Sequence, residues 1–108
     1  MPGEFEGAKS RRRYERATGP FEGFLEDQSM LVYDLNLGGG FVNTPHQPQI
    51  GSRLVLRISL PQEGWITVNA EALYQHEHGF AVCFHDLDPD AAARIARTVE
   101  SLKRHRGF

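Results

Sequence analysis

Residues 53–74, RLVLRISLPQEGWITVNAEALY, contain two runs in which apolar and polar side chains alternate. Successive side chains of a β-strand point to opposite faces, so a period of two predicts two half-buried strands joined at Pro61-Gln-Glu-Gly64. The side chains expected to share the inner face are Leu54, Leu56, Ile58, Leu60, Ile66, Val68, Ala70, Ala72 and Tyr74.

Shorter runs of strand-forming residues flank this pair, with turn-forming residues between them. They cover residues 21–25, 30–33, 40–43 and 80–84. Six short strands within residues 21–85 favour an antiparallel barrel over a design of alternating strands and helices.

A helix is expected after the strands, over residues 89–104. Asp88 suits the N-cap, and Pro89 suits the first helical position, where its missing N–H costs nothing. Helical spacing gives an apolar stripe that can lie on the barrel, formed by Ala92, Ile95, Ala96, Val99 and Leu102. The predicted fold class is therefore mainly β, a six-stranded antiparallel barrel with a C-terminal α-helix.

The net charge of −2 conceals a strong segregation of charge along the chain. Residues 8–16 and residues 94–108 each carry five basic side chains against one acid, whereas residues 17–93 hold ten acids against two arginines. An acidic body repels a nucleic-acid backbone, while two basic ends can still capture a small anion. This pattern argues against a nucleic-acid polymer as the partner, including a single strand bound across exposed aromatics beside a basic groove.

The expected location is the cytoplasm of a bacterium. No apolar run approaches the length of a membrane span, and the N-terminal residues lack a signal-peptide layout. Residues 1–10 are polar and without periodicity, so we expect a flexible N-terminal tail ahead of a domain that covers residues 11–108.

Motifs of enzymatic chemistry are missing from the sequence, so we expect a non-enzymatic module without a cofactor or a metal ion. His76 and His78 flank Glu77 in a predicted turn near His85, and a solvated loop is the favoured interpretation. The single cysteine, Cys83, lies in an apolar run and is expected to be a buried, inert thiol.

Two short motifs carry the functional hypothesis. The first is the basic run Arg11-Arg-Arg-Tyr-Glu-Arg16, and the second is Asp34-Leu-Asn-Leu-Gly-Gly39. Alone, the first is typical of a solvated tail and the second of a β-turn. Together they suit a guanine nucleotide, because arginine forks bind phosphate oxygens and guanine O6 and N7, and a carboxylate accepts from guanine N1–H and N2–H₂.

In this order and spacing, the sequence resembles the PilZ domain family of cyclic di-GMP receptors. The family pattern is Arg-x-x-x-Arg followed by Asp/Asn-x-Ser-x-x-Gly, matched here by residues 12–16 and 34–39. The resemblance continues through the strands and the closing helix, over roughly residues 11–102. One departure stands at the serine position, which is Asn36 here.

The resemblance implies a cyclic di-GMP site with residues in defined roles. Arg12 and Arg16 would grip phosphates and guanine faces, Asp34 would bind a guanine edge, and Gly39 would shape the turn beneath. Arg11 is similar to the residue in family members that take up an intercalated pair of ligands. Asn36 could replace the hydrogen bonds of the serine hydroxyl, although it needs more room.

The favoured hypothesis is a receptor whose arginine arm, residues 11–16, becomes ordered on binding cyclic di-GMP and presents a new surface to an unidentified protein partner. The alternative is a PilZ-like interaction module that binds no nucleotide and works through protein contacts. Asn36 and the basic C-terminal helix favour that alternative.

Overall fold

The computed structural model describes residues 15–107 of the 108-residue chain, with the side chains described up to Leu102. The predicted tail, residues 1–10, lies outside the described residues, as do residues 11–14 of the arginine arm. Among the described residues, no helix is long and apolar enough to cross a membrane.

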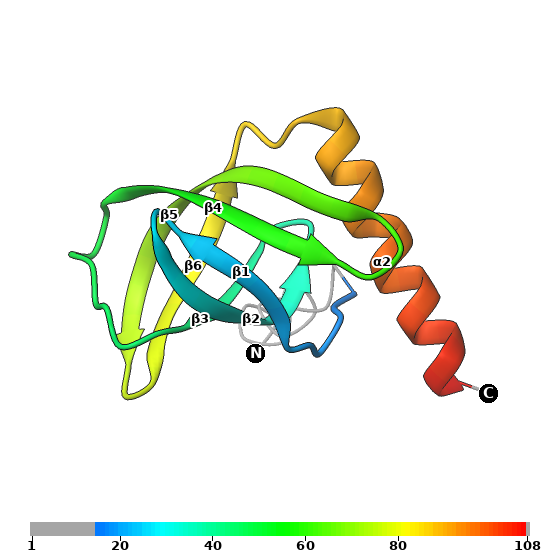
Figure 1. Cartoon of the computed structure of the whole chain (residues 1–108), viewed down its shortest axis with the longest axis horizontal. Helices are drawn as coiled ribbons and strands as arrows, with labels where there is room; N and C mark the ends of the chain where they lie inside the picture. The colour runs from blue at the N-terminus through cyan, green and yellow to red at the C-terminus, as the bar shows by residue number, and fades with distance from the viewer. Residues whose placement is uncertain (1–14, 108) are drawn as a thin grey trace, which may run out of the picture.

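Six strands close into an antiparallel barrel with the order β1-β2-β3-β6-β5-β4, in which β1 pairs with β4 to complete the circle. A C-terminal helix, α2, lies against one side of the barrel (Figure 1). The predicted fold class is therefore confirmed. The bounds are β1 Phe21–Leu25, β2 Gln28–Asn36, β3 Gly39–Asn43, β4 Arg53–Leu60, β5 Gly64–His76, β6 Gly79–His85 and α2 Pro89–Gly107.

The barrel interior is filled by the alternating apolar side chains of the strands. In β4, Leu56, Ile58 and Leu60 are buried as the alternation predicts, and they pair across the sheet with β5. Phe80 of β6 is fully buried and is among the largest side chains in the core. The inward set of β5 is confirmed up to Ala72, but Tyr74 is 59% exposed, so the predicted inward orientation of that tyrosine is wrong.

β2 is longer than the sequence predicts, because it continues beyond Tyr33 to Asn36. Leu35 is fully buried and forms an antiparallel bridge with Ala17, a residue ahead of the first strand. That pairing lies outside the predicted 30–33 run and depends on a residue well separated from it in sequence. The second motif therefore lies within a paired strand and the turn that follows it.

Asp88 caps α2 as predicted, because its Oδ2 accepts hydrogen bonds from the backbone N–H groups of Asp90 and Ala91 at 3.1 and 3.2 Å. The helix continues to Gly107, beyond the expected end at residue 104. Ile95 and Val99 are buried as predicted, whereas Ala96 is exposed. The buried face is rotated toward Ala91 and Thr98, and the Thr98 hydroxyl donates to the carbonyl of Arg94 at 2.9 Å.

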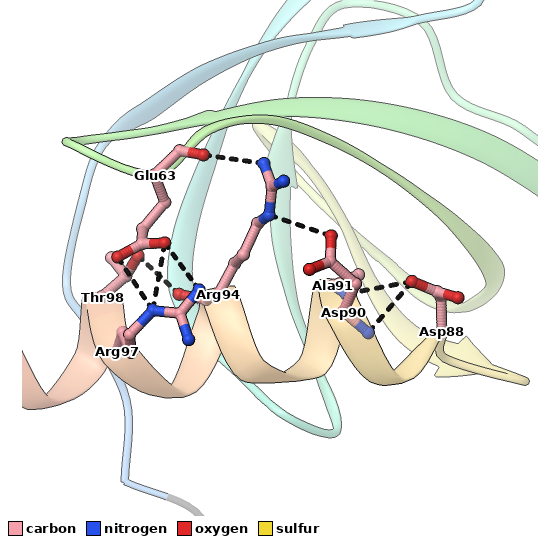
Figure 2. Close-up of polar contacts among 7 residues, drawn as sticks. All are labelled: Glu63, Asp88, Asp90, Ala91, Arg94, Arg97 and Thr98. Carbon is pink, nitrogen blue, oxygen red and sulfur yellow. Dashed lines mark hydrogen bonds and ion pairs between the residues drawn. The ribbon is translucent and has the colours of Figure 1, made fainter.

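Glu63, in the turn between β4 and β5, holds α2 against the barrel (Figure 2). Arg94 donates from Nη1 to the Glu63 carbonyl at 2.8 Å, and Arg97 donates from Nε and Nη2 to the two carboxylate oxygens at 3.1 and 3.0 Å. The hydrogen bond from Arg97 lowers the pKa of Glu63, and the same bond raises the pKa of Arg97. Two basic residues at the start of the C-terminal basic segment are thus engaged with the barrel.

Replacing Ile95 with alanine should lower the free energy of unfolding by about 2–5 kcal/mol, because a fully buried side chain would leave a cavity between α2 and the barrel. Ile50→Ala is the matched control, since Ile50 is 52% exposed and should change stability by less than about 0.5 kcal/mol. Chemical denaturation of both variants measures the difference. Equal, small effects would show that α2 is not packed on the barrel in solution.

Candidate functional site

A bulge in β2 positions the acidic residue of the second motif. The register with β3 shifts between Tyr33 and Asn36, so that one extra residue is accommodated on the β2 side. Asp34 has φ of +54°, a left-handed conformation that aspartate tolerates better than most residues. Its side chain is exposed, while Leu35 next to it points into the core. The bulge thus turns the Asp34 carboxylate toward solvent at the edge of the barrel.

The same bulge brings the end of the arginine arm to Asp34. Ala17 and Leu35 exchange two backbone hydrogen bonds of 2.8 Å, and the N–H of Asp34 donates to the carbonyl of Thr18 at 3.1 Å. Ala17 is itself 2% exposed, so the bridge is anchored in the core. Arg16 precedes this bridge, and its position beside Asp34 is therefore set by backbone pairing.

Asn36 stabilises the turn between β2 and β3 through its side-chain amide. Its Oδ1 accepts from the N–H groups of Gly38 and Gly39 at 2.7 and 3.2 Å, and its Nδ2 donates to the carbonyl of Asp34 at 3.1 Å. These contacts make an Asx-type turn. In this structure the asparagine at the family's serine position thus has a local structural role.

Gly39 allows β6 to approach β3 closely. A Cβ on Gly39 would overlap the carbonyl oxygen of Val82 and would lie 2.9 Å from the Cα of Cys83. Glycine is therefore required here by the neighbouring backbone. Gly39 also lines the pocket beside Asn36.

A second bulge re-aims two side chains of β5. The β5–β6 register shifts between Ala72 and Tyr74, so Leu73 is the additional residue. Leu73 and Tyr74 are consequently both exposed, by 42% and 59%. The strict alternation used to place Tyr74 in the core fails at this residue.

These features surround one surface pocket of about 330 Å³. It lies on the outside of the barrel, over the β2–β3 turn and the strands β3, β6 and β5. The lining residues that carry chemistry or large surfaces are Arg16, Asp34, Asn36, Phe41, Leu73, Tyr74 and Cys83. Both register shifts among the described strands contribute residues to this pocket.

Four residues predicted for the site from the sequence meet here: Arg16, Asp34, Asn36 and Gly39. Arg11 and Arg12 lie outside the described residues, so their part in the site stays a prediction. Sequence analysis missed the contributions of Phe41, Leu73, Tyr74 and Cys83. Their signal was weak, because apolar residues in strands are indistinguishable from core residues until the register is known.

Cys83 departs from the prediction of a buried thiol. It is half-buried on the outer face of β6, where its Sγ lies 3.6 Å from Nε2 of His85. His85 in turn contacts Oε1 of Glu71 at 2.7 Å. The apolar run around Cys83 did not predict its burial correctly. The residues of the run that face the core are the alternate ones, Phe80, Val82 and Phe84, and Cys83 lies on the opposite face.

A larger pocket of about 530 Å³ lies elsewhere, mainly over β1 and β2 beside Trp65. Trp65 is 52% exposed and stacks on Phe24, with ring centroids 5.9 Å apart. None of the described residues that line this pocket is basic, and Glu22 contributes a negative charge. The pocket that contains Arg16 is therefore better suited to an anionic ligand, despite its smaller volume.

The PilZ domain profile matches residues 10–101, which is most of the chain. The chain belongs to the PilZ domain family. The matched segment contains both short motifs and the entire described barrel. None of the curated proteins matches this chain.

Solved PilZ structures have the same fold. The PilZ domain with c-di-GMP of YcgR from Escherichia coli shares 20% identity over 89% of this chain and 94% of that one, with a TM-score of 0.67. YcgR from E. coli in complex with c-di-GMP shares 24% identity over 90% of this chain, with a TM-score of 0.71. The Bacillus subtilis inhibitor of motility, MotI/DgrA, shares 19% identity over 89% of this chain, with a TM-score of 0.68. The match spans 48% and 51% of the latter two chains.

The turn around Asn36 yields a stability prediction. Asn36→Ala should lower the free energy of unfolding by about 1 kcal/mol, because the N–H groups of Gly38 and Gly39 lose their shared acceptor. Asn36→Ser should lose less, since a serine hydroxyl can make the same type of turn more weakly. Chemical denaturation of the two variants provides the comparison. If serine is as harmful as alanine, the hydroxyl does not replace the amide oxygen in this turn.

Proposed function

We propose that this PilZ domain is a non-enzymatic receptor that binds cyclic di-GMP in the pocket formed by Arg16, Asp34 and the β2–β3 turn. The observation that carries the proposal is that Arg16, the last residue of the first motif, lines one surface pocket together with Asp34, Asn36 and Gly39 of the second. Two of the solved structures with the same fold are described as complexes with c-di-GMP, which supports this choice of ligand.

The polar groups of the pocket suit the two kinds of edge that the ligand offers. The Arg16 guanidinium can donate to a phosphate oxygen or to guanine O6 and N7 through two N–H groups at once. The exposed Asp34 carboxylate can accept from the N1–H and N2–H₂ groups of guanine. A fork of donors beside an acceptor thus matches an anionic ligand with a donor-rich base edge.

The apolar part of the pocket suits the flat faces of the bases. Leu73 and Tyr74 are large, exposed side chains on the β5 bulge, and Phe41 is half-buried on β3. Aromatic and aliphatic side chains bind nucleobases by stacking and by excluding water. We assign Tyr74 the role of a stacking platform for a guanine.

Arg11 and Arg12 complete the proposed site from the N-terminal side. The Ala17–Leu35 bridge directs the chain at Arg16 toward the pocket, so the preceding residues are within reach of a ligand there. In the proposed mechanism, ligand binding orders the arm, residues 11–16, across the barrel. The ordered arm and the bound nucleotide then form the surface that a protein partner recognises.

Isothermal titration of the full chain should show saturable binding of cyclic di-GMP and none of comparable affinity for GTP. Arg16→Ala should abolish that binding while leaving the barrel folded, because Arg16 is exposed and the substitution removes a charged donor fork at the surface. Circular dichroism of the variant verifies the fold.

Arg57→Ala is the matched control, since Arg57 is an exposed arginine of β4 that does not line the pocket. Retained affinity in Arg16→Ala would contradict the assignment of Arg16. Saturation at one nucleotide per chain would contradict the uptake of a ligand pair through Arg11. If the chain does not bind cyclic di-GMP at high micromolar concentration, the receptor proposal is contradicted. The alternative, an interaction module that binds no nucleotide, would then be favoured.

Tyr74→Ala should weaken cyclic di-GMP binding by about 1–3 kcal/mol, the usual value of one base–aromatic stack. Tyr74→Phe should retain the affinity, because the ring and not the hydroxyl is assigned the contact. The same titration measures both variants. An equal loss in the phenylalanine variant would show that the hydroxyl carries the contact and would overturn the stacking role.

A further inference from the structure

Three side chains that favour transition metals meet on the outer face of the barrel beside the pocket. Glu71 extends from β5, and Cys83 and His85 extend from β6. Their potential ligand atoms, a carboxylate oxygen, a thiol sulfur and an imidazole nitrogen, all lie within 4.8 Å of one another. Glu71 and His85 do not line the nucleotide pocket, and Cys83 lines it without a role in the nucleotide contacts proposed above.

The pairing of β5 with β6 holds the three residues in this arrangement. Glu71 lies directly opposite Cys83, and Asn69 lies opposite His85. Cys83 and His85 are two residues apart on one strand, so their side chains point to the same face. The three ligands therefore project from adjacent positions of a closed sheet, which leaves them little backbone freedom to lose on binding an ion.

The distance between the sulfur and nitrogen ligand atoms of the cluster is close to that of tetrahedral zinc coordination. Zinc lies about 2.3 Å from sulfur and about 2.0–2.1 Å from an imidazole nitrogen, which places the two ligand atoms about 3.5 Å apart. The Sγ of Cys83 and Nε2 of His85 are separated by 3.6 Å.

The carboxylate needs a small adjustment. Its Oε1 is 2.7 Å from Nε2 of His85, a hydrogen-bond distance. In tetrahedral coordination the nitrogen and oxygen ligand atoms would be about 3.3 Å apart. A side-chain rotation of Glu71 that moves Oε1 by roughly half an ångström would therefore make room for an ion.

The three side chains of the cluster are partly exposed to solvent. The side chains of Glu71 and His85 are 30% and 31% exposed, and Cys83 is half-buried, so an ion can enter from solvent. Arg53 also approaches Glu71, with Nε 3.8 Å from Oε1, but its side chain is 64% exposed. A solvent-exposed ion pair at this distance is weak.

The chemistry of the ligands selects the class of ion. A thiolate and a carboxylate supply two negative charges, and a neutral imidazole completes a mixed sulfur, nitrogen and oxygen set. Calcium and magnesium prefer oxygen ligands, whereas zinc and similar ions accept all three donor types. Three protein ligands leave a fourth position for solvent.

We propose that Glu71, Cys83 and His85 bind one borderline transition-metal ion of the zinc type. The sequence predicts no metal site, because no cysteine pair or spaced set of carboxylates accompanies its histidines. Here the carboxylate is twelve residues before the cysteine, and strand pairing brings the two together. The proposal does not depend on nucleotide binding, although Cys83 also lines the nucleotide pocket.

The test uses the full chain without an affinity tag, reduced and freed of metal with a chelator. Titration with Zn²⁺ against a chromophoric chelator should show one ion per chain, and zinc should raise the melting temperature. Co²⁺ should give the visible spectrum of a tetrahedral site together with a thiolate-to-cobalt charge-transfer band. That band identifies the cysteine as a ligand.

Cys83→Ser and His85→Gln should each weaken zinc binding by more than about tenfold, since loss of a direct ligand exceeds the usual effect of a supporting contact. Cys83→Ser should also remove the charge-transfer band. His78→Gln is the matched control, because His78 is exposed in the neighbouring turn. The zinc affinity of this variant should equal that of the parent chain. Melting curves of the metal-free variants verify that they remain folded.

Absence of the charge-transfer band, or equal zinc affinity in the parent and Cys83→Ser, would overturn the proposal. Loss of binding in His78→Gln would also overturn it, because the ion would then reside at the His76–His78 turn.

Discussion

The closed ladder of backbone hydrogen bonds is the constraint on which the rest of this structure depends. Each strand pairs with a neighbour on both sides, and β1 with β4 completes the circle. The register of this ladder is determined by the alternating apolar side chains, because a slip of one residue would bring charged residues such as Arg57 into the core. Every departure from the register must therefore be local, and the structure confines the two register shifts of its described strands to the surroundings of one pocket.

These two bulges shape the surface that carries the proposed nucleotide site. The bulge in β2 sends Leu35 into the core and Asp34 to the surface, and it opens the backbone of the strand to pairing with Ala17. The bulge in β5 turns Tyr74 outward toward the same pocket. A regular barrel with the same sequence would carry an inward-facing Tyr74. Irregular pairing thus has a constructive role at this site, as it has next to many binding sites.

The helix and the strands are joined by a different type of interaction. The apolar face of α2 covers one side of the barrel, and the Glu63 turn grips Arg94 and Arg97 through a carbonyl and a carboxylate. The bidentate contact of Arg97 with Glu63 fixes the orientation of α2 on the barrel, because its geometry is more specific than that of apolar packing. None of the described residues that line the pocket belongs to α2.

The sequence by itself determined the elements whose signals are local. The period of two identified β4 with its bounds, Arg53–Leu60, and Asp88 with Pro89 identified the start of α2. The two motifs also predicted that Arg16, Asp34, Asn36 and Gly39 lie together, and all four line one pocket. Only the tertiary structure decided the exposure of Tyr74, the rotation of the helix face away from Ala96 and the meeting of Glu71 with Cys83 and His85. The physical reason is that bulges, register and helix docking depend on pairing between residues far apart in the chain, which periodicity within one segment does not encode.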